Sequence, residues 1–234
     1  MRNAFAASVT RLASKDANIV LLAGDIGNRL FDEYKDSFPS RFYNCGVAEA
    51  SMTGLASGLA SSGLKPITYT ITPFNTLRCL EQIRVDVCYP DLPVIIVGTG
   101  SGISYASLGV THHSLEDIAI MRVLPNMNVL APSDSIEVDL ALEAALQLGK
   151  PTYIRIGKKG EPVVHTKKPN FEIGKAITLH KGEGIALVGV GTMLSVAQEC
   201  RNLMISEGHN PSLISLHSIK PLDENLLKQL FLDY

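Results

Sequence analysis

The stretch DLPVIIVGTG, residues 91–100, decides the fold. Its apolar residues run together instead of alternating with polar ones, which is typical of a strand buried on both faces of a parallel sheet. The run ends in a glycine-rich exit, and the stretch NIVLLAGD at 18–25 repeats the pattern with a Gly-Asp exit. Because binding sites in such sheets form where the strands end, we expect functional residues to follow these runs.

Extended and helical segments alternate on either side of this strand. The other expected strands are 18–25, 41–46, 65–72, 127–133 and 151–157. The expected helices are 3–14, 48–62, 75–88, 115–124 and 134–149. Gly63 is a candidate C-cap for the second helix, and Ser133 or Asp134 a candidate N-cap for the last. This alternation predicts an α/β fold built on a doubly wound parallel sheet.

The chain turns polar at KKGEPVVHTKKPNF, residues 158–171, which indicates a boundary. We therefore expect a first domain over 1–158, a linker over 159–173 and a partial second α/β domain over 174–234. The second domain shows only two candidate strands and two candidate helices, at 184–191, 211–217, 193–208 and 222–232. A self-standing sheet usually needs more, so this domain is either minimal or truncated, and the pattern favours truncation.

Composition and charge exclude several classes of protein. With 46% hydrophobic residues and a formal net charge of −2, the chain can form a large core but offers no basic field to nucleic acids or anionic membranes. Its four cysteines form no CxxC pair, which favours free thiols in a reducing compartment. We find no signal-peptide pattern and no apolar run of membrane-spanning length, so we expect a cytoplasmic protein.

The stretch NCGVAEASMTGLASGLASSG, residues 44–63, places a single acid, Glu49, at the head of a helix of small and apolar residues. A buried carboxylate is costly unless it is hydrogen-bonded or takes up a proton. The stretch contains no Lys, Arg or His. The partner must therefore come from elsewhere in the fold, from another chain or from a ligand. The simpler alternative is an acid favoured only by the helix dipole.

Three segments carry a resemblance to a known family. They are FYNCGVAEASMTGLASGLASSGLKPI (42–67), FNTLRCLEQIRVDVCYPDLPVIIVGTGSGISYASLGVTHHSLEDIAIMRVLPNMNVLAPSD (74–134) and PTYIRIGKKG (151–160). Together and in this order they resemble the pyrimidine-binding domain of transketolases, most closely the C-terminal subunit of split, two-gene transketolases. The resemblance covers most of 1–158, and 174–234 looks like the first part of the family's C-terminal domain.

The resemblance implies a site for thiamine diphosphate. Glu49 of GVAEASM matches the glutamate that hydrogen-bonds N1′ of the cofactor's aminopyrimidine and activates it. Phe74 matches an aromatic that stacks on this ring, while Ile71 stands where a second aromatic is expected. Asp25 of AGDIG is implied to face the cofactor region, and Arg78 either lines the site or is structural. Taken alone, Phe74 reads as a core residue and Asp25 as a turn former.

The resemblance also implies substrate contacts. His112 of GVTHHSLED matches the histidine that reaches the substrate's oxygens, and an imidazole there suits proton relay near neutral pH. Leu108 stands where single-chain transketolases carry an aspartate that meets a donor hydroxyl, so the sugar preference is expected to differ. Arg2 and Lys158 match cations that hold a substrate phosphate. For these two cations a solvated-surface interpretation is equally open.

The family's Gly-Asp-Gly motif with paired asparagines, which holds Mg²⁺ and the diphosphate, is absent from the sequence. We therefore expect no metal ligands in this chain and an N-terminal partner subunit that supplies them. The predicted function is that of the C-terminal subunit of a transketolase, in a heterotetramer with a homodimer core, acting on sugars or sugar phosphates. Alternatives are an E1 β-subunit-like component, a deoxyxylulose-phosphate-synthase-like component, or a non-catalytic relic that binds a partner.

Overall fold

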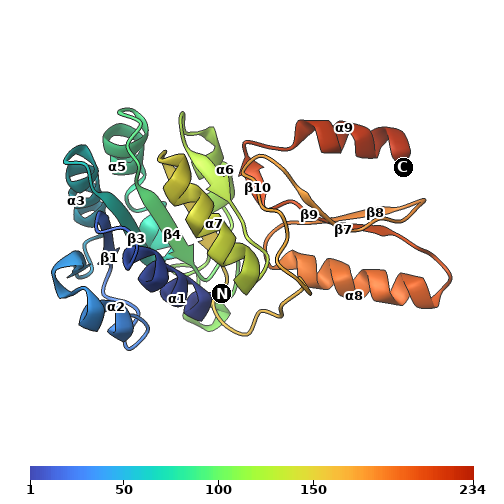
Figure 1. The fold of residues 1–234 in the computed structure, drawn as a ribbon, viewed down its shortest axis with the longest axis horizontal. Helices are drawn as coiled ribbons and strands as arrows, with labels where there is room; N and C mark the ends of the chain where they lie inside the picture. Colours follow the sequence, from blue (N-terminus) through green and yellow to red (C-terminus); the bar gives the residue numbers. More distant parts are fainter.

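The computed structural model describes all residues, 1–234. Its main body is a seven-stranded sheet in the order β10-β5-β6-β4-β3-β1-β2, with a three-stranded sheet of order β7-β9-β8 beside it (Figure 1). In the main sheet the strands are β1 (Ile19–Ala23), β2 (Phe42–Asn44), β3 (Lys65–Ile71), β4 (Ile95–Thr99), β5 (Asn128–Leu130) and β6 (Thr152–Ile156). All of these pair in parallel. The predicted α/β fold with a parallel sheet is confirmed.

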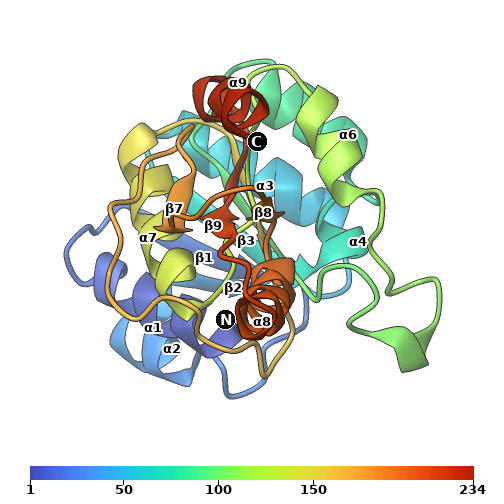
Figure 2. The ribbon, with the colours of Figure 1, turned by 90° about the vertical axis from the view of Figure 1, so that its right-hand side faces the viewer.

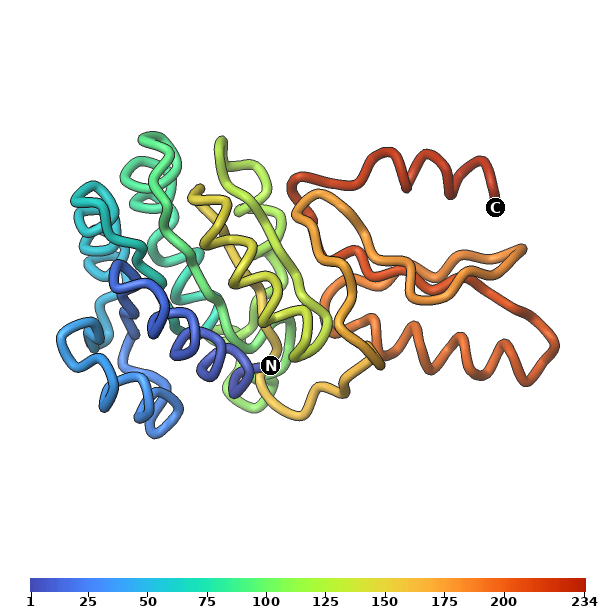
Figure 3. The backbone as a smooth tube through the Cα atoms, in the orientation of Figure 1, coloured from blue at the N-terminus to red at the C-terminus, as the bar shows by residue number.

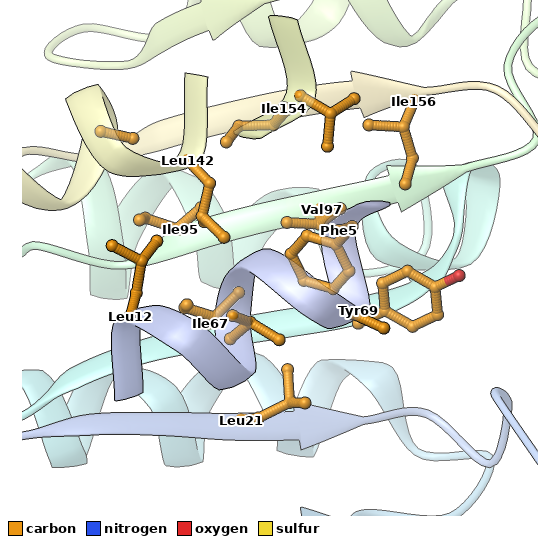
Figure 4. Close-up of a cluster of buried hydrophobic side chains, with 14 of the residues drawn as sticks. Phe5, Leu12, Leu21, Ile67, Tyr69, Ile95, Val97, Leu142, Ile154 and Ile156 are labelled. Carbon is orange, nitrogen blue, oxygen red and sulfur yellow. The ribbon is translucent and has the colours of Figure 1, made fainter. Parts of the chain in front are cut away.

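Helices cover both faces of the main sheet. On one face lie α1 (Arg2–Ala13), α2 (Asp32–Ser37) and α7 (Ser135–Leu148), and on the other α3 (Glu49–Ser61) and α6 (Asp117–Val123). Successive residues of each strand point to opposite faces, so Leu21 packs in the first core and Leu22 in the second. Figure 4 shows the first core, where Phe5 and Leu12 of α1 meet Ile67 and Tyr69 of β3.

Helix ends follow local capping chemistry. Asp134 caps α7, because its carboxylate accepts hydrogen bonds from the backbone N–H groups of Ile136 and Glu137. Helix α3 ends at Ser61, and the C-cap is Ser62 rather than the predicted Gly63. Gly63 follows directly, with a φ of 89° that suits a residue without Cβ.

The predicted single helix over 75–88 is wrong. The segment is divided into α4 (Thr72–Asn75), α5 (Leu80–Gln82) and a π-helical turn, η2 (Ile83–Cys88). The break has a physical cause at Asn75, which is fully buried and donates its side-chain amide to the carbonyl oxygen of Val97 at 3.0 Å. The Thr76 hydroxyl bonds back to the carbonyl of Thr72 at 2.7 Å, and its φ of −130° leaves the helical region.

The second unit contains more strands than predicted. Strands β7 (Ile177–His180), β8 (Ala186–Gly189) and β9 (Ser212–Ser215) form the small sheet, and Figures 1 and 2 place α8 (Met193–Ser206) and α9 (Glu224–Asp233) on opposite sides of it. The prediction missed β7, whose residues alternate between half-buried and exposed. It also missed β10 (Ser218–Lys220), which crosses to the main sheet and pairs antiparallel with β5.

The link between the units runs without helix or strand from β6 to β7 (Figure 3). A buried polar cluster holds the junction: Glu137 of α7 accepts from the Ser215 hydroxyl at 2.6 Å and lies 2.7 Å from His165 Nε2. His217 is fully buried beside it, stacked on Phe171 at 3.9 Å between ring centroids. Burial lowers the pKa of His217 to about 4, so this imidazole is neutral at pH 7.

No helix has both the length and the apolar character needed to cross a membrane. All four cysteines are free thiols, two of them buried in the second core.

Candidate active site

The carboxyl ends of β1, β3, β4 and β6 meet along one edge of the main sheet, as parallel pairing requires. The predicted site residues Asp25, Phe74 and Lys158 follow these ends, and Ile71 is the last residue of β3. In open α/β sheets this edge is where ligands bind. The edge therefore brings together residues that are far apart in the sequence.

Glu49 begins α3 and is buried, with 1% of its surface exposed. Its Oε2 accepts a hydrogen bond from Arg78 Nη1 at 2.6 Å, and the Arg78 side chain is 43% exposed. Gly24 leaves room for the acid, because a Cβ there would lie 3.3 Å from the Glu49 Cγ. A buried acid needs a hydrogen-bonding partner from the fold, from another chain or from a ligand. In this structure the fold supplies it.

Phe74 presents an aromatic surface beside this ion pair. The Arg78 guanidinium carbon lies 4.3 Å from the centre of the Phe74 ring, within the range of a cation–π contact. Arg78 lies in the turn between α4 and α5 and contacts both Glu49 and Phe74. Ile71 caps α4 and is half-buried, and it adds no second aromatic face.

His112 reaches the same place from a different segment. Its ring lies edge-on to Phe74, with centroids 5.0 Å apart, and its Nδ1 lies 2.9 Å from the Thr111 hydroxyl. Leu108 lies on the short 3-10 turn η3 (Ala106–Leu108) of the same loop and is 52% exposed. The imidazole therefore borders the aromatic face, while Leu108 lies on the same loop with an exposed apolar side chain.

A cationic pocket of about 450 Å³ lies at the N-terminus of α1. Its lining includes the predicted Arg2 and Lys158 together with Arg29 and Lys159, and no acid. Lys158 Nζ also lies 4.3 Å above the Tyr105 ring, whose centroid is 6.0 Å from that of His112. The pocket therefore adjoins the loop that carries His112.

Asp25 makes a different set of contacts. It has a φ of 50°, which is uncommon for a residue with a side chain, and it is exposed. Its backbone N–H donates to Asn44 Oδ1 at 3.2 Å, and its Oδ1 accepts from Asn44 Nδ2 at 3.1 Å. These bonds fix the turn after β1, and the structure does not bring Asp25 into contact with Glu49, Phe74 or Arg78.

Sequence reasoning missed three groups near this edge. Arg29 lines the cationic pocket and has a φ of 62°. No sequence pattern marks it, because its place in the pocket depends on this turn conformation. Lys159 was overlooked beside Lys158. Arg155 did leave a signal, since a charged residue inside the apolar strand YIRIG needs a partner, which is the buried Asp117 at 2.7 Å.

Comparison with known proteins decides the family. The family model for the transketolase pyrimidine-binding domain matches residues 1–161, and the model for the transketolase C-terminal domain matches residues 174–234. The chain belongs to the transketolase family.

Relatives within the transketolase family differ in length. The chain is 31% identical over 230 residues to one of the subunits of the apulose-4-phosphate transketolase of Phocaeicola vulgatus, covering 97% of this chain and 74% of that protein. It is 32% identical over 231 residues to 1-deoxy-D-xylulose-5-phosphate synthase of Desulfotalea psychrophila, covering 96% of this chain and 36% of that one. Among solved structures, a split-gene transketolase described as an inactive beta4 tetramer matches with a TM-score of 0.89 at 34% identity, over 97% of this chain and 75% of that one.

No group of three or more His, Cys, Asp or Glu side chains is arranged to hold a metal ion. The residues present suit another kind of ligand, because a buried carboxyl beside an aromatic face fits a flat heteroaromatic ring that carries a nitrogen. The edge of this transketolase sheet therefore suits a flat ring such as the pyrimidine of the family's cofactor.

Proposed function

We propose that this chain is the pyrimidine-binding, C-terminal subunit of a thiamine-diphosphate-dependent transketolase that moves a two-carbon ketol unit between sugars or sugar phosphates. The observation that carries the proposal is the burial of Glu49 against Arg78, beside the Phe74 ring and within one aromatic contact of His112. Membership of the transketolase family supports it. We also propose the domain division 1–158, 159–173 and 174–234.

Each residue has a defined task in this proposal. Thiamine diphosphate, when bound, supplies the electron sink that holds the ketol unit during transfer. Glu49 holds a proton between its carboxyl oxygen and a ring nitrogen, in a dry setting that strengthens the hydrogen bond. Phe74 packs on the ring face, and His112 donates to or accepts from a substrate oxygen.

The cationic pocket selects the far end of the substrate. Arg2, Arg29, Lys158 and Lys159 line it without an acid, which suits a terminal phosphate or another dianion. Leu108 makes no demand for a hydroxyl at the place where an aspartate would. We therefore propose an anionic sugar substrate whose donor differs from the usual one near the carbons that this aspartate would read.

The other half of the site comes from a second polypeptide in this proposal. This chain has no cluster for Mg²⁺, so an N-terminal transketolase subunit is proposed to supply the metal and diphosphate ligands. We propose a heterotetramer with a homodimer of this chain at its centre, and the beta4 tetramer of the similar split-gene protein supports self-association. The free thiols are consistent with a cytoplasmic location.

Calorimetry and a ketol-transfer assay test this function. The isolated chain is expected to bind thiamine diphosphate weakly or undetectably, and the pair with its N-terminal subunit to bind it tightly only with Mg²⁺. Tight, Mg²⁺-dependent binding by this chain alone would contradict the split site.

The assay also separates the alternatives. Transfer from a ketose donor supports the transketolase proposal. Activity with pyruvate and an aldehyde phosphate would favour a deoxyxylulose-phosphate-synthase-like component, and activity with another 2-oxoacid an E1 β-like one. Assembly with the partner but no turnover on any donor would favour a non-catalytic role.

A further inference from the structure

The loop between β4 and α6 carries His112 and Leu108 and stands out from the main body (Figure 2). Its base is closed by two hydrogen bonds, Gly102 N–H to the Ser114 carbonyl at 3.0 Å and Ser114 N–H to the Gly102 carbonyl at 2.9 Å. Beyond the base, the backbone bonds of Leu108 and His112 stay within the loop. Apart from the ring contacts of His112 with Phe74 and with the buried Tyr105, the position of His112 therefore depends on how firmly the base is held.

Arg155 lies directly under this base. It is on β6, and its Nη2 donates to the Ser114 carbonyl at 3.3 Å, the same oxygen that Gly102 uses. Its Nε donates to Asp117 Oδ2 at 2.7 Å, at the start of α6. The guanidinium thus joins three segments: the strand, the loop base and the helix.

This junction is largely buried. The Asp117 side chain is 1% exposed and the Arg155 side chain 16%. Water therefore hydrates neither charge well, and each needs the other as its partner. Tyr153, two residues earlier on β6, donates its hydroxyl to the same Asp117 Oδ2 at 2.6 Å, whereas Asp117 Oδ1 is buried without a hydrogen-bond partner. Of the two side chains that bond to this carboxylate, Arg155 is the one that also bonds to the loop base.

We propose that Arg155 is a positioning residue for substrate binding: anchored on Asp117, it holds the base of the 102–114 loop so that His112 lies against Phe74. This rests on the proposed function, in which His112 contacts the substrate. A guanidinium can bond in two directions with its planar fork, whereas a lysine ammonium on a flexible stem keeps the charge without that geometry. Arg155→Lys therefore preserves the partner of Asp117 and loses the link to Ser114.

Hydrogen exchange on the full chain tests the anchor without any catalysis. In Arg155→Lys, amides of residues 102–114 should exchange roughly 3- to 10-fold faster, as expected for the loss of about one hydrogen bond at the base. The matched control is Tyr153→Phe, which removes a bond from the same Asp117 oxygen but leaves Ser114 alone. The loop should exchange at the parent rate in this control. Unchanged exchange in Arg155→Lys, or an equal rise in both variants, would overturn the proposal.

Kinetics of the reconstituted pair add a second measurement. A residue that only stabilised the fold would not change the KM for the donor selectively. Arg155→Lys should raise the KM for the ketose donor about tenfold, as for a weakened contact made equally in ground and transition states, with kcat and cofactor affinity unchanged. A fall in cofactor affinity of the same size would contradict a loop-specific role. If the parent pair transfers no ketol unit, the proposed function fails, while the exchange measurement still decides whether Arg155 anchors the loop.

Discussion

Replacing Arg78 by methionine should leave Glu49 as a buried carboxylate without a positive partner. The two side chains meet at 2.6 Å, with Glu49 1% exposed. Removing one partner of a fully buried ion pair costs about 3–5 kcal/mol. Because the Arg78 side chain is 43% exposed, water screens part of the attraction, and we expect a loss of about 1–3 kcal/mol in the free energy of unfolding.

Thermal unfolding of the isolated chain at neutral pH measures this loss. For a domain of this size each kcal/mol shifts the Tm by about 2–4 °C, so Arg78→Met should lower it by about 2–12 °C. Arg84→Met is the matched control, because Arg84 lies on the following turn, is exposed and forms no ion pair. This control should unfold within about 0.5 kcal/mol of the parent, as is usual for surface substitutions.

A second substitution decides whether the buried charge causes the loss. Adding Glu49→Gln to Arg78→Met removes the carboxylate that lacks a partner, so most of the lost stability should return. A chain that tolerates Arg78→Met without change, or a double variant as unstable as the single one, would refute the view that Arg78 is what makes the buried acid tolerable.

Three further changes test the site and the junction. Glu49→Gln in the reconstituted pair should reduce ketol transfer by about 10²–10⁴-fold with the fold intact, as for a positioned acid–base group, and near-full activity would make Glu49 structural. Leu108→Asp should gain relative activity on xylulose 5-phosphate in a donor panel, and a loss on that sugar would show that Leu108 does not face the donor. The folded pKa of His217, about 4, lies below the unfolded value of 6.5, so its contribution to stability is complete above pH 6.5 and is lost as pH falls toward 4. His217→Phe should therefore remove about 2–3 kcal/mol of the acid-induced loss between pH 7 and pH 4.5 in urea unfolding, and an unchanged pH dependence would contradict this account.

The fold was predictable where burial leaves an unbroken apolar run. Strands β1 and β4 have a core on each side, so all residues of Ile19–Ala23 and Ile95–Thr99 are apolar or small, and the sequence shows it. The helix break at Asn75 and Thr76 was not predictable, because it depends on hydrogen bonds to Val97 and Thr72 that exist only in the folded chain. Strand β10 is too short to carry a period.

The candidate site was predictable to a similar extent. The small residues around Glu49 indicated burial, and the structure buries it, but the identity of its partner required the tertiary fold. Arg78 is 29 residues away in sequence and reaches Glu49 from the turn between α4 and α5. The roles of Glu49, Phe74 and His112 stay predictions, which the experiments above address.

Strand β10 belongs by sequence to the second unit, yet it hydrogen-bonds to β5 of the first. A chain divided in the linker would leave β5 as an open edge and Glu137 without the Ser215 hydroxyl. The two units are therefore joined within the main sheet, and the linker does not mark the boundary between independent parts. Chimeras between members of this family should fold best when the crossover point keeps β5, β10 and Glu137 from one parent, even where the linkers align without a gap.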